Sequence, residues 1–187
     1  GAIHSSGDLA QLTISNSTLT INRTDGSGSF GGAIASLGNL TISDSTVANN
    51  TSVKGGGIYS DSGASNTATI SRSTVDHNQA PVDETSNGGG IANHGNLILE
   101  NSTVCNNNAA ASGGGIFNNA SASISSSTIC SNLAGNGPTA TGGGIYSAAP
   151  GVVTLRNTIV GDNLDHFSIP SDVGGEWSSG GYNLIET

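Results

Sequence analysis

The chain lacks methionine, has one tryptophan and carries little charge. Only 9% of its 187 residues are charged and 4% are aromatic, whereas about 25% of residues are charged in an ordinary globular domain. Lys54 is the only lysine and the net charge is −9, so no basic stripe exists for nucleic acid or anionic lipid. Apolar runs are only a few residues long, too short for a membrane span. We therefore expect neither a nucleic-acid partner nor direct membrane insertion.

Glycine, serine, threonine and asparagine supply most of the chain, and they recur in a fixed order. Such a composition is typical of disorder, but a periodic pattern indicates a repeat architecture instead. One element, Gly-Gly-Gly/Ala-Ile or a shortened form of it, occurs six times. It begins at Gly1, Gly31, Gly55, Gly88, Gly113 and Gly142.

Each glycine element is followed by a short segment in which apolar and polar residues alternate. In 40–43 the sequence Leu-Thr-Ile-Ser places two apolar side chains on one face, the pattern of a half-buried strand. The anchoring apolar positions recur about every 28 residues, at Ile14, Ile42, Ile70, Leu99, Ile124 and Leu155. The pattern predicts an all-β, right-handed parallel β-helix of about six rungs, with three short strands per rung. We divide the chain into repeats at 1–163 and a final coil or cap at 164–187.

An asparagine stands at the same place in every repeat, three residues after the apolar residue of a Ser-Thr-Val-type element. These residues are Asn22, Asn50, Asn78, Asn107, Asn132 and Asn163. Buried amides need partners for both the C=O and the NH₂ group, and stacked identical amides can supply them. We therefore predict an internal asparagine ladder. The alternative is a set of exposed turn asparagines, because asparagine is common in turns.

The two cysteines also occupy equivalent places in consecutive repeats. Cys105 follows Val104 and Cys130 follows Ile129, so stacking would bring their Cα atoms within disulfide range. We expect a disulfide, which an oxidising location would favour. Two stacked free thiols are the alternative.

The repeat resembles those of polymorphic outer-membrane proteins, which pair a Gly-Gly-Ala-Ile element with Phe-x-x-Asn. Here Gly31-Gly32-Ala33-Ile34 matches the first element, and Val47-x-x-Asn50 stands in place of the second. The C-terminal stretch, with 159–163, 172–173 and 179–185, is similar to the end of bacterial choice-of-anchor β-helix proteins. These resemblances imply a bacterial surface or secreted location and no defined activity.

We interpret the chain as a non-catalytic structural or adhesive module, extracellular or on the cell surface. It would carry no cofactor and no metal. Self-association through the solenoid ends and a glycan or host-surface ligand are the partners we expect, and the loops at 79–87 and 134–141 are the candidate contact sites. Asp83 and Glu84 form the one adjacent acidic pair considered for acid–base or cation chemistry, and we interpret it as a solvated loop.

Two other functions remain open. A polysaccharide lyase or hydrolase of this shape would need clustered carboxylates, whereas the outward positions of the middle strands are mostly Thr and Ser. Ice binding would use an outward Thr/Ser face such as Thr13, Thr41 and Thr69, although Arg72, Glu100 and other side chains interrupt it.

Overall fold

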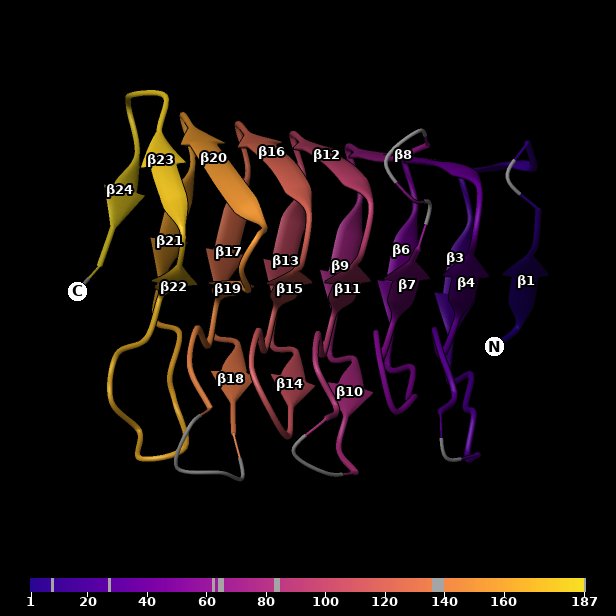
Figure 1. Ribbon diagram of the computed structural model, residues 1–187, viewed down its shortest axis with the longest axis horizontal. Helices are drawn as coiled ribbons and strands as arrows, with labels where there is room; N and C mark the ends of the chain where they lie inside the picture. The colour runs from indigo at the N-terminus through magenta and orange to yellow at the C-terminus, as the bar shows by residue number, and fades with distance from the viewer. Residues whose placement is uncertain are drawn as a thin grey trace.

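The chain forms a parallel β-solenoid in a computed structural model (Figure 1). The structure describes residues 1–7, 9–26, 28–61, 63, 66–82, 85–135 and 140–186. No helix occurs among these residues, so none of them belongs to a helix that could cross a membrane. The predicted all-β parallel solenoid with a spacing of about 28 residues is confirmed.

Three seven-stranded parallel sheets run along the solenoid axis, and each turn contributes one strand to each sheet. The first sheet contains β1 (Ile3–Ser5), β4 (Ile34–Ser36), β7 (Ile58–Ser60), β11 (Ile91–Asn93), β15 (Ile116–Asn118), β19 (Ile145–Ser147) and β22 (Val173–Gly175). The second contains β2 (Gln11–Ser15), β5 (Asn39–Ser43), β8 (Thr67–Ser71), β12 (Asn96–Glu100), β16 (Ser121–Ser125), β20 (Val152–Arg156) and β23 (Trp177–Ser179). The third contains β3 (Thr18–Thr20), β6 (Thr46–Ala48), β9 (Thr74–Asp76), β13 (Thr103–Cys105), β17 (Thr128–Cys130), β21 (Ile159–Gly161) and β24 (Leu184–Ile185).

A fourth, smaller sheet extends the pattern of three strands per turn. It contains β10 (Gln79–Ala80), β14 (Asn108–Ala109) and β18 (Leu133–Ala134), which pair in parallel. Each of these two-residue strands directly follows a ladder asparagine. They were not predicted, because the alternation of apolar and polar residues at this place in the repeat is too short to indicate a strand.

The register stacks like residues over like, and this stacking builds the core. Ile34 pairs with Ile58, and Ile42 pairs with Ile70. Inward side chains of this kind are fully buried in the central turns, Leu99 among them. Since a single turn buries too little apolar surface to offset its chain entropy, each turn depends on its neighbours.

Besides the first glycine of the glycine element, two non-glycine corner residues in each complete turn adopt a left-handed backbone conformation. The first follows the second-sheet strand, as Asp44 (φ 50°) and Asn101 (φ 49°) do, and the second precedes the ladder asparagine, as Asn49 (φ 57°) does. Asparagine and aspartate tolerate this conformation better than other non-glycine residues, which explains why Asn and Asp recur at these corners.

The segment after residue 163 adds a seventh set of strands, β22, β23 and β24, which pair with β19, β20 and β21. Its inward residues depart from the repeat. Trp177 pairs with Val153, and Ser179 pairs with Leu155, so an indole ring and a hydroxyl replace the aliphatic side chains of the preceding turn.

Candidate ligand-binding surface

The six ladder asparagines form one continuous chain of hydrogen bonds inside the solenoid. In each step the Oδ1 atom accepts two bonds from the preceding asparagine, one from its backbone N–H and one from its Nδ2, at 2.9–3.0 Å. The Nδ2 groups also donate to strand carbonyls, as Asn107 does to Val75 and Cys105. The five ladder asparagines after Asn22 are at most 1% exposed, and Asn22 itself is half-buried. These side chains therefore stabilise the fold and offer no ligand surface.

A second internal ladder, made of serines, lies at the corner between the second and third sheets. The backbone N–H of each serine donates to the Oγ atom of the next at 3.1–3.2 Å, and each Oγ donates to the carbonyl two residues earlier. The row comprises Ser17, Ser45, Ser73, Ser102 and Ser127. This ladder was not predicted, although the serine that precedes Thr-Val or Thr-Ile in the repeat was a visible signal for it.

Cys105 and Cys130 form a disulfide, with their Cα atoms 4.7 Å apart on the paired strands β13 and β17. Another cross-turn contact joins Arg72 to Asp44 through two hydrogen bonds of 2.7 Å. This exposed ion pair lowers the pKa of Asp44, mainly through the hydrogen bond from Arg72. Both contacts link neighbouring turns, so they reinforce the stack.

Acidic and histidine side chains are dispersed over the described part of the chain. Asp83 and Glu84 lie outside the described residues. In the part of the chain that the structure describes, no group of three His, Cys, Asp or Glu side chains could hold a metal ion. Asp76 and His77 contact each other at 2.6 Å at an exposed corner, and His166 packs edge-on against Phe167.

An aromatic column runs along the outer face of the first sheet. Ring centroids follow one another at 4.4, 5.3, 5.7 and 6.1 Å, in the order Phe30, Tyr59, His94, Phe117 and Tyr146. Burial within this column lowers the pKa of His94 and raises that of Tyr59. Tyr59 and Phe117 are buried, His94 and Tyr146 are half-buried, and Phe30 is 41% exposed, so the column is partly covered and most open at its N-terminal end.

At that end Phe30 and Tyr59 border a pocket of about 570 Å³. Asp61 also lines it and accepts a hydrogen bond from the Tyr59 hydroxyl at 3.1 Å. Gly1 and His4 of the first turn also line this pocket.

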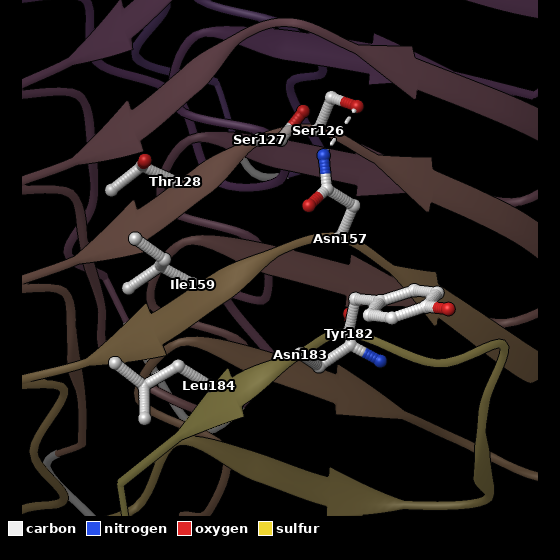
Figure 2. Close-up of a pocket in the computed structure, with 8 residues that line it drawn as sticks. All are labelled: Ser126, Ser127, Thr128, Asn157, Ile159, Tyr182, Asn183 and Leu184. Carbon is white, nitrogen blue, oxygen red and sulfur yellow. Dashed lines mark hydrogen bonds between the residues drawn. The ribbon is translucent and has the colours of Figure 1, made fainter.

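A groove on the outer face of the third sheet is shown in Figure 2, with a volume of about 370 Å³. Two parallel rows of side chains border it. One row follows the first corner of successive turns and contains Ser126, Asn157 and Tyr182; the other follows the third-sheet strands and contains Thr128, Ile159 and Leu184.

The groove changes character toward the C-terminal end. In the strand row, Thr18, Thr46, Thr74, Thr103 and Thr128 stack in register and are followed by Ile159 and Leu184. These two aliphatic side chains are 50% and 66% exposed, and Tyr182 is 88% exposed. Exposed apolar side chains grouped in this way are typical of an interaction site. The replacement of Thr by Ile159 was visible in the repeat, whereas Leu184 lies in the irregular last turn.

The two mid-chain loops expected to carry binding are only partly described, because 83–84 and 136–139 lie outside the described residues. Val82, beside the first of these segments, is 62% exposed.

Comparison with known protein families gives a match to one part of the chain. Residues 44–61 match the model of the Chlamydia polymorphic membrane protein repeat. This segment runs from the first corner of one turn through ladder residue Asn50 and the glycine element to β7 of the next turn. No curated protein sequence and no solved structure matches the chain significantly. The chain is therefore a parallel β-solenoid that contains a segment similar to polymorphic membrane protein repeats.

Proposed function

We propose that the chain is a non-catalytic structural or adhesive module of an extracellular or cell-surface protein. The match of residues 44–61 to a polymorphic membrane protein repeat supports the surface location. The disulfide between Cys105 and Cys130 agrees with an oxidising compartment.

One observation carries the proposal: successive turns are bonded to one another through internal polar ladders of asparagine and serine. The asparagine ladder alone joins six turns by paired hydrogen bonds. In such an array each turn contacts only its neighbours and the whole behaves as a stiff rod. The outer sheet faces and the loops are then free to vary, which suits a module that extends or displays a binding surface.

The absence of catalysis is part of the proposal. The outward positions of the second sheet, where a lyase or hydrolase would gather carboxylates, hold stacked hydroxyl residues such as Thr41, Thr69 and Ser43. Incubation with a panel of plant, bacterial and animal polysaccharides should leave their chain lengths unchanged. Shortened chains released by purified protein would contradict this part of the proposal.

Self-association through the solenoid ends is also proposed. Among the described residues, β1, β2 and β3 at one end and β22, β23 and β24 at the other each have one edge without a strand partner, and unpaired edges favour strand addition. Electron microscopy of the concentrated protein should show end-to-end pairs or short rods. Isolated single particles at the highest soluble concentration would contradict self-association but leave the rest of the proposal intact.

Adhesion is tested directly with coated beads. Beads that carry the folded protein should adhere to cultured epithelial cells more than beads that carry the same protein unfolded by reduction and heat. Equal adhesion of the two preparations would reject a specific adhesive role. A purely structural module would still be detected by its stiffness in single-molecule stretching.

A second candidate function, ice binding, is favoured by the in-register threonine rows. Thr13, Thr41 and Thr69 stack on the second sheet, and five threonines stack on the third. Regularly spaced hydroxyl and methyl groups could order surface water. Thermal hysteresis in the purified protein would support this function, and its absence would exclude it.

A further inference from the structure

We infer that the groove between the Tyr182 row and the Leu184 row binds a neutral saccharide. This inference rests on the proposed adhesive function and names the ligand class of one surface. Three observations support it: the backbone conformation of Tyr182, the exposed apolar side chains of the neighbouring row, and the absence of ionised side chains among the residues that line the groove.

Tyr182 occupies a corner position that a bulky residue rarely takes. The Asn157 N–H donates to the carbonyl of Gly181, just as the Ser126 N–H donates to that of Arg156, so Tyr182 continues the row of first corners. The earlier members of this row are Asn16, Asp44, Arg72, Asn101, Ser126 and Asn157, with φ between 48° and 50°. Tyr182 has φ 60° and no side chain that bonds back to the local backbone, so its conformation is less favourable than that of asparagine.

Within the described part of the chain, the ring of Tyr182 makes no buried packing contacts that would offset the energy of this backbone conformation. It is 88% exposed, and its hydroxyl has no hydrogen-bond partner among the described residues. A strained and exposed aromatic residue is a reason to infer binding. In Figure 2 the ring of Tyr182 projects outward from the corner row, while the amide of Asn157 points toward Ser126 and donates to its Oγ atom at 3.1 Å.

The rest of the lining fits a ligand with hydroxyl groups and C–H faces. Exposed Ile159 and Leu184 supply an apolar wall, while Asn157, Ser126 and Thr128 supply an amide and hydroxyls. The electron-rich face of an aromatic ring attracts the slightly positive C–H bonds of a sugar ring in the way it attracts the edge of another aromatic ring. The volume of about 370 Å³ falls within the range of small-molecule sites.

Charge favours a neutral saccharide over an acidic one. None of the eight residues that line the groove is ionised at neutral pH, and the chain as a whole carries a net charge of −9. A sialylated or sulfated glycan would therefore meet no cation in the groove and a repulsive field around it.

The test is a glycan array that contains neutral oligosaccharides of glucose, galactose, mannose and their N-acetylated amines, together with sialylated and sulfated glycans. The wild-type protein should bind neutral members, and calorimetry with the best of them should show affinity at least tenfold weaker for Tyr182→Asn. Asparagine is the residue of the preceding corner, so this variant should fold at least as well as the wild type. Phe167→Ala, which removes another aromatic side chain that is 62% exposed, is the matched control and should bind normally.

The outcomes separate this inference from the proposed function. Absence of neutral-glycan binding, or equal binding by Tyr182→Asn, overturns the saccharide site, as does selective binding of acidic glycans. If wild-type and Tyr182→Asn beads adhere equally to cells, adhesion stands without this groove. If wild-type protein binds glycan but its beads do not adhere, the groove stands and the adhesive role fails. Sedimentation that shows self-association lost in Tyr182→Asn would assign the groove to a second copy instead.

Discussion

Asp172 terminates the ladder by accepting two hydrogen bonds from Asn163 through one carboxylate oxygen, Oδ1, at 3.2 Å from the backbone N and 2.7 Å from Nδ2. This is the acceptor role that each ladder asparagine plays for the one before it. Asp172 reaches the ladder from the position of the third glycine in the repeat, since the N–H of Ile145 donates to its carbonyl as that of Ile116 does to Gly144. Its other oxygen, Oδ2, is buried without a hydrogen-bond partner among the described residues.

The buried carboxylate predicts a dependence of stability on pH. Burial raises the pKa of Asp172 above its ordinary value of 3.8, against the opposing effect of the Asn163 bonds. The folded state therefore binds the proton more tightly than the unfolded chain, so this contribution is fully present below pH 3.8 and is lost as the pH rises through the folded pKa. Asp172→Asn should melt at a higher temperature than wild type at pH 7, with a difference that narrows toward pH 4.

Thermal denaturation from pH 4 to pH 8 measures this difference. Glu100→Gln is the control, because it also removes one negative charge but at an exposed position. Parallel melting profiles for wild type and Asp172→Asn would show that Asp172 is not the source of the pH dependence.

Removing one central ladder amide should destabilise the whole solenoid. In Asn107→Leu the N–H and Nδ2 of Asn78 lose their acceptor, and the carbonyl of Val75 loses a donor. Each buried group left unpaired costs about 1–3 kcal/mol, so we expect a loss of about 2–5 kcal/mol in the free energy of unfolding. Urea denaturation measures it.

The neighbouring Asn108 provides the matched control for the ladder. Its side chain is exposed on β14, so Asn108→Leu should change stability by less than about 0.5 kcal/mol. If both variants unfolded at the same urea concentration, the ladder would contribute nothing specific to the fold.

The repeat made the main sheets predictable because a residue that recurs at a fixed spacing must stack on itself in a solenoid. The aromatic column could not be predicted in the same way. Tyr59 and Phe117 occupy one strand position, but the turn between them has Ala92 there. His94 comes from a different position of the repeat, and its ring lies between those of Tyr59 and Phe117. The repeat spacing alone does not reveal that a residue from another position takes the place of an aromatic residue.

Tyr182 was missed for a related reason. The last turn lacks the spacing of the others, with a shortened path between β22 and β23 and one extra residue between β23 and β24, so its corner cannot be aligned by counting. Backbone hydrogen bonds identify the position, and they depend on the fold. The repeat spacing therefore predicted the fold, whereas the arrangement of side chains on the outer surface could be seen only in the structure.

The disulfide should stabilise the protein by restricting the unfolded chain. It closes a segment with a sequence separation of 25 residues, for which chain entropy predicts about 3 kcal/mol. We expect a reducing agent to lower the free energy of unfolding by about this amount in wild type. The variant with both Cys105→Ser and Cys130→Ser should show the lower stability already and should not respond to the reductant; a response in that variant would point to an effect unrelated to this bond.

In the repeats that have glycine at the third position, an added side chain should destabilise the solenoid, because the ladder asparagine of the same turn lies against that glycine, as at Gly57, Gly90, Gly115 and Gly144. A Cβ atom at Gly115 would lie 2.9 Å from the Cγ atom of Asn132 and 2.6 Å from the carbonyl oxygen of Gly144. That oxygen accepts the N–H of Ile116, so neither neighbour can move without weakening the stack. Overpacking of this kind typically costs about 1–3 kcal/mol, and we expect Gly115→Ala to lose that amount in urea denaturation.

Gly161→Ala separates overpacking from the general effect of replacing glycine in this fold. A Cβ atom there would meet only the exposed Glu186 side chain, at 3.4 Å or more, which is an ordinary contact. The backbone of Gly161 is not left-handed, so alanine should be tolerated and can even stabilise the chain by reducing the freedom of its unfolded state. Equal losses in the two variants would mean that the asparagine ladder does not confine the glycine, and the close packing of glycine against amide would then not explain why the motif recurs.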